Sequence, residues 1–151
     1  MPYNRHYIET GVMDALKDLG MSGDALKSWS DFIVMIIAHE SAKGRYIKQI
    51  KGPALGLSQM EPATHDDIAK YLNKKPRYRD YFKRTFGGFD ANKLYDIHYM
   101  ACMSRCFFLR FPEPLPDGSD YSLAQYAKKR WNTYLGKATP EDYLDAYKEW
   151  N

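Results

Sequence analysis

The sequence has few cysteines, and the two that it has are placed badly for a disulfide. Cys102 and Cys106 lie four residues apart, a spacing that puts both on one face of a helix but outside good disulfide geometry. No metal-ligand spacing accompanies them. We therefore expect free, buried thiols, typical of a protein made in a reducing compartment, and neither a disulfide scaffold nor a bound metal.

The sequence also lacks a long apolar run and a strong net charge. The longest apolar run, residues 32–38, is far shorter than the about 20 residues that a membrane helix needs. Residues 1–16 mix charged with apolar side chains, unlike a secretory signal peptide. The formal net charge of +3 is mild, whereas a strong nucleic-acid binder is usually more basic. We expect no membrane insertion and no nucleic acid as a partner.

The apolar residues that are present follow helical spacing along most of the chain, which predicts a mainly α-helical single domain over residues 1–151. The stretch 92–111 is apolar nearly all round and is predicted to be the central buried helix. The glycine-punctuated stretch 42–60 predicts an irregular insertion with room for a short β-hairpin. Further helices are predicted over residues 8–19, 22–40, 62–73, 121–131 and 139–150.

The last of these helices carries a start signal. Thr139 is its predicted N-cap, Pro140 its first residue and Asp142 the acid three residues after the cap, nearly a capping box.

Glu40 lies two residues after the end of the apolar run and before the glycine-bearing turn. Burial disfavours a carboxylate, and the C-terminal end of a helix adds partial negative charge, so both effects raise the pKa of Glu40. A carboxylic acid that stays protonated near neutral pH can act as a general acid, for instance toward a glycosidic oxygen. A glutamate at a helix end is more commonly solvated surface, so the residues at fixed spacing from Glu40 decide between the two interpretations.

The neighbours of Glu40 in the chain suggest no other chemistry. The His39 side chain is expected to point away from that of Glu40, since adjacent helical residues face different directions. Ser41 has no evident base partner, so a nucleophilic serine is not expected.

The spacing around Glu40 resembles that of the lysozyme-like lytic transglycosylases. That family has a Glu-Ser pair, a loop, and then Gly-Leu-Met-Gln and a Met-Pro-Ala-Thr helix start. Glu40-Ser41 and the stretch ALGLSQMEPAT at residues 54–64 follow this pattern, with Ser58 and Glu61 at positions where methionine is usual. Residues 96–111 are similar to a later helix of the family, and Trp131-Asn132 stands at its Tyr-Asn position. The resemblance spans roughly residues 29–147.

The resemblance implies a lysozyme-like α+β fold and a peptidoglycan-cleaving enzyme without cofactor or metal. Glu40 is the implied catalytic acid and later base. Ser41 and Gln59 are implied to help position Glu40 and the N-acetyl group of the sugar, and Gly56 to allow close approach of the backbone to the glycan. Trp131 and Asn132 would line the cleft, with tryptophan removing the hydroxyl that a tyrosine offers to Glu40.

The implied reaction is cleavage of the MurNAc–GlcNAc bond with formation of a 1,6-anhydro end. A muramidase that hydrolyses the same bond would use a second carboxylate, for which Glu61 is the candidate. Two further hypotheses are a relative that cuts the peptide cross-links and a virion structural or wall-binding protein with a silent site. The resemblance favours a bacteriophage protein that is made in the host cytoplasm and reaches the wall through a holin lesion or within a virion.

Two basic runs, residues 74–84 and 128–130, mix cations with aromatic residues. The favoured interpretation is a solvated helix face over core aromatics. Binding of an anionic wall polymer or of nucleic acid is the competing interpretation. The oligomeric state leaves no mark on the sequence.

Overall fold

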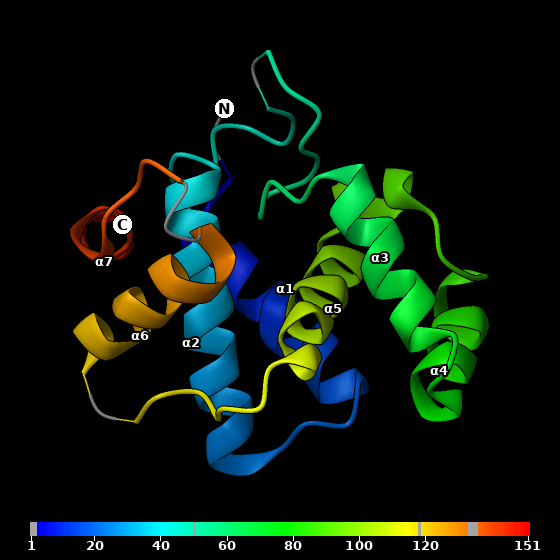
Figure 1. Ribbon diagram of the computed structural model, residues 1–151. Helices are drawn as coiled ribbons and strands as arrows, with labels where there is room; N and C mark the ends of the chain where they lie inside the picture. The colour runs from blue at the N-terminus through cyan, green and yellow to red at the C-terminus, as the bar shows by residue number, and fades with distance from the viewer. Residues whose placement is uncertain (1–2, 50, 118, 133–135) are drawn as a thin grey trace.

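The computed structural model describes residues 3–49, 51–117, 119–132 and 136–151 and is mainly helical, as predicted (Figure 1). Within these ranges no helix combines the length and the apolarity needed to cross a membrane. The α-helices are α1 (Arg5–Asp18), α2 (Gly23–Glu40), α3 (Pro62–Leu72), α4 (Pro76–Phe86), α5 (Ile97–Phe107), α6 (Asp120–Tyr126) and α7 (Pro140–Glu149). Shorter turns are η1 (Ala91–Tyr95), η2 (Phe108–Arg110) and the π-helix η3 (Ala127–Asn132).

Helix α2 is buried on two sides and joins two apolar clusters. Ile33 and Ile37 belong to a cluster shared with α1, α3, α4 and α5, whereas Phe32 and Ile36 belong to a second cluster shared with α6 and α7. Figure 1 shows α6 and α7 on one side of α2, and α1 and α5 on the other. Because each large buried apolar side chain contributes about 1.5–3 kcal/mol, this double burial fixes the position of the C-terminal end of α2.

The predicted central helix over residues 92–111 is buried but interrupted, so its expected bounds are wrong. The segment divides into η1, α5 and η2. Asp96 has an extended backbone (φ −81°, ψ 130°), and its side chain accepts a hydrogen bond from the Tyr99 amide at 2.9 Å. Asp96 therefore ends one helical element and caps the next, a local signal that the apolar pattern does not reveal.

The predicted irregular insertion between α2 and α3 is confirmed, and it has little regular pairing. Its described residues form two isolated antiparallel bridges, in which Leu55 pairs with Lys48 and with Met60. In Figure 1 this segment lies at the top of the molecule, over the C-terminal end of α2. The chain that follows Glu40 therefore folds back over the end of the helix that carries it.

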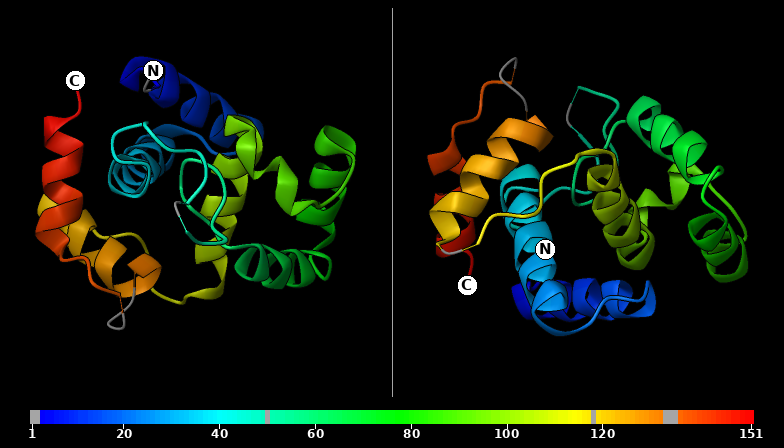
Figure 2. Two further views of the ribbon diagram at one scale, coloured as in Figure 1. Left: turned by 90° about the horizontal axis from the view of Figure 1, so that it is seen from above. Right: turned by 60° about the horizontal axis from the view of Figure 1, so that its bottom comes forward.

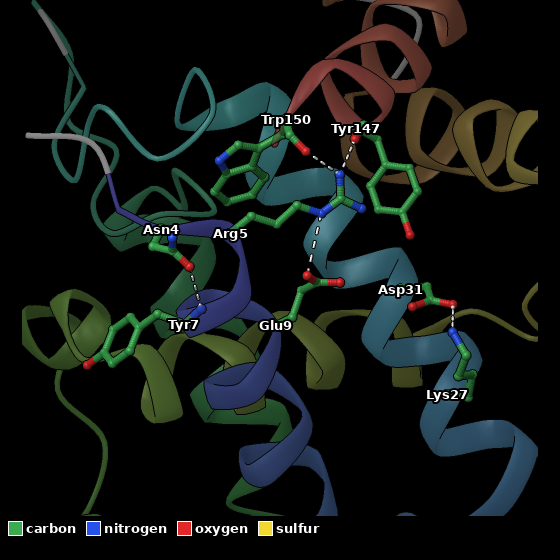
Figure 3. Close-up of polar contacts among 8 residues, drawn as sticks. All are labelled: Asn4, Arg5, Tyr7, Glu9, Lys27, Asp31, Tyr147 and Trp150. Atoms are coloured by element: carbon green, nitrogen blue, oxygen red, sulfur yellow. Dashed lines mark hydrogen bonds and ion pairs between the residues drawn. The ribbon is translucent and has the colours of Figure 1, made fainter.

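Helix α7 is anchored at both ends. At its start the capping box is complete: the Thr139 hydroxyl accepts from the Asp142 amide, and the Asp142 carboxylate accepts from the Thr139 amide. At its end the Arg5 guanidinium donates to the carbonyl oxygens of Tyr147 (2.5 Å) and Trp150 (2.7 Å), as Figure 3 shows. These contacts hold the last helix in place beside α2, although the two lie far apart in sequence.

The cysteines are as predicted. Cys102 and Cys106 are both free and buried in α5. Burial raises the pKa of the Cys102 thiol to about 12 and raises that of Cys106 as well, so both thiols are protonated at neutral pH and behave as core side chains.

Candidate active site

A cleft of about 460 Å³ lies where the C-terminal end of α2 meets the insertion, within the size range of small-molecule sites. Its walls come from α2, the insertion, the start of α3, the end of α5 and the end of η3. The lining residues are Glu40, Tyr46, Lys48, Gln49, Ala54, Gln59, Met60, Glu61, Thr64, Phe107, Trp131 and Asn132. Tertiary folding thus brings together five of the sequence-predicted site residues from three distant segments, namely Glu40, Gln59, Glu61, Trp131 and Asn132.

Glu40 is the last residue of α2 and is partly buried at the cleft wall. Burial raises the pKa of Glu40 from its ordinary value of 4.5 to about 7, and a hydrogen bond from Tyr143 opposes part of this rise. Phe107 and Trp131 line the same cleft and provide its apolar walls. A carboxyl group with a pKa near 7 can both donate and accept a proton at neutral pH.

Tyr143 is the partner of Glu40 that the sequence does not reveal. Its hydroxyl donates a hydrogen bond to Glu40 Oε1 at 3.0 Å, across 103 residues of chain. The Tyr143 side chain is fully buried, and burial, followed by the nearby Glu40 charge, holds the pKa of its hydroxyl well above the usual range. Tyr143 therefore remains a donor at any pH at which Glu40 titrates.

His39 also contacts Tyr143. The two ring centroids are 4.4 Å apart at an interplanar angle of 47°, and burial lowers the pKa of His39. Glu40 lines the cleft and His39 is not among the lining residues, although the Tyr143 side chain contacts both. His39 acts there as a neutral packing partner.

Asn132 is the last residue of η3 and lines the same cleft as Glu40. Its Oδ1 accepts a hydrogen bond from Lys128 Nζ at 2.8 Å. Lys128 also donates to the Gly136 carbonyl oxygen at 2.9 Å. These contacts hold the Asn132 side chain at the cleft wall.

Trp131 forms an aromatic wall of the cleft. Its ring lies 4.9 Å from the Phe107 ring and 5.8 Å from the Phe108 ring, the latter nearly stacked at 23°. Trp131 is held by packing against these rings, and among the described residues it makes no hydrogen bond to Glu40. Flat aromatic faces beside polar groups suit a sugar ring, which has one apolar face and hydroxyls at its edge.

Gln59 has a left-handed backbone conformation at the cleft wall, with φ of 55°. Its Nε2 donates to the Gly56 carbonyl oxygen at 2.8 Å. A non-glycine residue in this region costs on the order of 1 kcal/mol and persists where the surroundings enforce it. Local strain of this kind is typical of ligand-binding segments.

Gly56 and Ser41 lie outside the cleft lining. Gly56 is buried with φ of 76°, and a Cβ there would lie 2.2 Å from the Leu94 carbonyl oxygen. Ser41 is fully buried; its hydroxyl donates to the Ile37 carbonyl oxygen at 2.5 Å and accepts from the Gly44 amide at 2.8 Å. Both residues shape the turns beside the cleft.

Glu61 is exposed at the rim of the cleft as the N-cap residue of α3, and its side chain makes no capping hydrogen bond. Its carboxylate is therefore available to a ligand, in contrast to the partly buried Glu40. The two carboxyl groups at this cleft therefore differ in their exposure to solvent.

The described residues contain no group of three or more His, Cys, Asp or Glu side chains that could hold a metal ion. Searches of protein-family models, of curated proteins and of solved structures find no match to this chain. Its function is therefore inferred from the cleft and from the motif spacing alone.

Proposed function

We propose that this chain cleaves the glycan strands of bacterial peptidoglycan at the MurNAc–GlcNAc bond, as a lytic transglycosylase of lysozyme-like fold. The observation that carries the proposal is Glu40, a partly buried carboxyl group in a cleft, with a pKa of about 7 and a hydroxyl partner at 3.0 Å. The motif spacing from Glu40 to Gln59 supports the same chemistry, as does an irregular insertion directly after a buried helix that ends in glutamate.

The reaction would need only Glu40 as a proton carrier. Protonated Glu40 gives its proton to the glycosidic oxygen as the bond from that oxygen to C1 of MurNAc breaks. The resulting carboxylate then takes the proton from the C6 hydroxyl of the same sugar as that oxygen bonds to C1. A 1,6-anhydro ring forms, Glu40 is protonated again and no water is consumed.

Tyr143 would act as a positioning residue in both steps. It holds one carboxyl oxygen of Glu40 and stabilises the carboxylate that exists between the two proton transfers, because a hydrogen bond to the charged form favours that form. Burial of the Tyr143 side chain and its ring contact with His39 would keep Tyr143 in its orientation.

A second candidate is a muramidase that hydrolyses the same bond. Glu61 favours it, since this carboxylate lies at the cleft rim without a capping bond and could direct a water molecule. We further propose that the protein belongs to a bacteriophage and reaches the wall from the host cytoplasm or within a virion, as the motif variants suggest.

Mass spectrometry of the fragments released from purified sacculi tests the proposal. Wild type is compared with Glu40→Gln, which keeps the shape of the side chain but cannot serve as an acid, and with Glu61→Gln as a matched control in the same cleft. We expect fragments that end in 1,6-anhydro sugars from wild type and from Glu61→Gln, and none from Glu40→Gln.

Different products would identify a different activity. Reducing ends, heavier by one water and lost in Glu61→Gln, would establish the muramidase. Released peptides with intact glycan would indicate an enzyme that cleaves the peptide cross-links of peptidoglycan. Absence of any product from wild type would overturn the enzymatic proposal and favour a wall-binding or structural protein.

A further inference from the structure

The positive charge of this chain is concentrated in one short segment outside the cleft. Residues 74–84 contain six cationic side chains and one acid, a formal net charge of +5, whereas the whole chain carries +3 and its remainder therefore −2. The cations are Lys74, Lys75, Arg77, Arg79, Lys83 and Arg84, and all six are exposed. We refer to this set as the basic face.

The fold explains why the basic face is exposed as a unit. Helix α4 buries Tyr81 and Phe82 in the first apolar cluster, which turns its other side to solvent. Helix α3, about 16 Å long at 1.5 Å per residue, begins at the cleft and ends beside α4. Figure 1 accordingly shows α4 at the opposite end of α3 from the insertion, and Figure 2 shows the same separation in two further views. A ligand on the basic face would leave the cleft open.

Few of these cations are neutralised by the chain itself. Among the described residues only Arg79 forms an ion pair, with Asp80 at 3.1 Å. Three others lie over tyrosine rings, at 5.1 Å for Arg77, 5.4 Å for Lys75 and 6.0 Å for Arg84. Packing on the rings restricts the side chains and so lowers the entropy that binding an anion would cost.

The basic face also breaks a local rule of helix design. Cations are unfavourable at a helix N-terminus, where the backbone already presents positive partial charge. Helix α4 nevertheless has Lys75 as N-cap, without a side-chain cap hydrogen bond, and Arg77 in its first turn. Violations of local preference without compensation are expected at functional sites, and here the missing compensation is negative charge.

We propose that the basic face binds a flexible anionic polymer that repeats phosphate groups, specifically the poly(glycerol phosphate) type of bacterial wall polymer. Phosphate repeats fit this set of cations, which occupies the two residues before α4 and about 12 Å of the helix from Pro76 to Arg84. The choice of a wall polymer rests on the proposed function. Nucleic acid is disfavoured, because each tyrosine ring beside these cations already has a cation over one face, which competes with base stacking.

Binding to purified poly(glycerol phosphate), measured by calorimetry over a series of salt concentrations, tests this proposal. The variant Lys74→Gln/Lys83→Gln/Arg84→Gln removes three cations from the basic face. The matched control Lys17→Gln/Lys137→Gln/Lys148→Gln removes three exposed lysines elsewhere, so both variants have a formal net charge of zero. Circular dichroism verifies that both are folded.

We expect wild type and control to bind alike, and the basic-face variant to bind at least tenfold more weakly at low salt. The slope of log K against log salt should fall by about 2 in that variant, since each lost phosphate contact removes about 0.7. Equal weakening in both variants would show a net-charge effect and overturn the proposal. Single-stranded DNA of equal charge that binds tenfold more tightly than the polymer would also overturn it, by identifying a nucleic-acid site.

The probe contains no glycan, so this test is independent of cleavage. If the chain binds poly(glycerol phosphate) but releases nothing from sacculi, the proposal for the basic face stands and the proposed enzymatic function is overturned. If the chain cleaves sacculi but does not bind the polymer, the enzymatic function stands and the proposal for the basic face is overturned.

Discussion

The raised pKa of Glu40 predicts a specific dependence of stability on pH. A carboxyl group whose pKa is higher in the folded than in the unfolded chain contributes stability that is fully present below the unfolded value. That contribution is lost as pH rises through the folded value. For Glu40 these values are 4.5 and about 7. The ionised group is thus destabilising at neutral and alkaline pH, where the unfolded chain gains more from its ionisation.

The size of the effect follows from the two pKa values. One pKa unit corresponds to about 1.36 kcal/mol, so between about pH 5 and about pH 8 the wild type should lose about 2.5 kcal/mol through this group. Glu40→Gln has no such group. Its free energy of unfolding, measured by urea denaturation, should therefore rise relative to wild type by about 2.5 kcal/mol over that interval.

The comparison is designed to isolate Glu40. His39 titrates in an overlapping range with the opposite sign, because burial lowers its pKa and its contribution is lost as pH falls. It is present in wild type and variant alike and largely cancels in the difference. Glu61→Gln, at an exposed position, serves as control and should show the wild-type profile. Parallel profiles for wild type and Glu40→Gln would refute the reasoning and leave Glu40 as an ordinary surface carboxylate.

Three further substitutions separate the supporting residues. Tyr143→Phe removes the hydrogen bond that lowers the pKa of Glu40, so this pKa should rise and the alkaline limb of the pH–rate profile should move to higher pH. An unchanged alkaline limb would show that Tyr143 does not act on Glu40. Gly56→Ala should destabilise the fold by more than about 2 kcal/mol in urea denaturation, because a Cβ meets the Leu94 carbonyl oxygen at 2.2 Å and φ is positive. Ser41→Ala should lower the free energy of unfolding by about 1–3 kcal/mol through its two lost hydrogen bonds and leave KM for glycan fragments unchanged. A raised KM with normal stability would show instead that Ser41 contacts the substrate.

The local features of this chain can be predicted because they depend on neighbouring residues. The apolar spacing within 22–40 identifies a buried helix that ends at Glu40, and the glycines after it identify an irregular turn. The Thr139–Asp142 capping box is a four-residue pattern and is predictable for the same reason. The break at Asp96 is not, since the apolar residues on both sides continue the same helical period.

Tyr143 illustrates what the sequence cannot show. The start of α7 is predictable, and with it a tyrosine one turn later, but nothing in the chain states that α7 packs against the end of α2, 103 residues away. That placement depends on Arg5, which reaches the carbonyl oxygens of Tyr147 and Trp150, and on the second apolar cluster. Gly56 is a similar case, because the sequence does not show that a Cβ at this position would lie 2.2 Å from the Leu94 carbonyl oxygen.

The sequence by itself therefore determined a helical chain with an acid at the end of an apolar helix and an amide in the turn that follows. Only the tertiary structure decided that this acid lies in a cleft with an aromatic wall and is held by a distant tyrosine, and that the cations of 74–84 lie on one exposed face. The reason is physical. Helix periodicity and capping are set by residues within one or two turns, whereas burial, pKa and the meeting of side chains depend on which helices share a core.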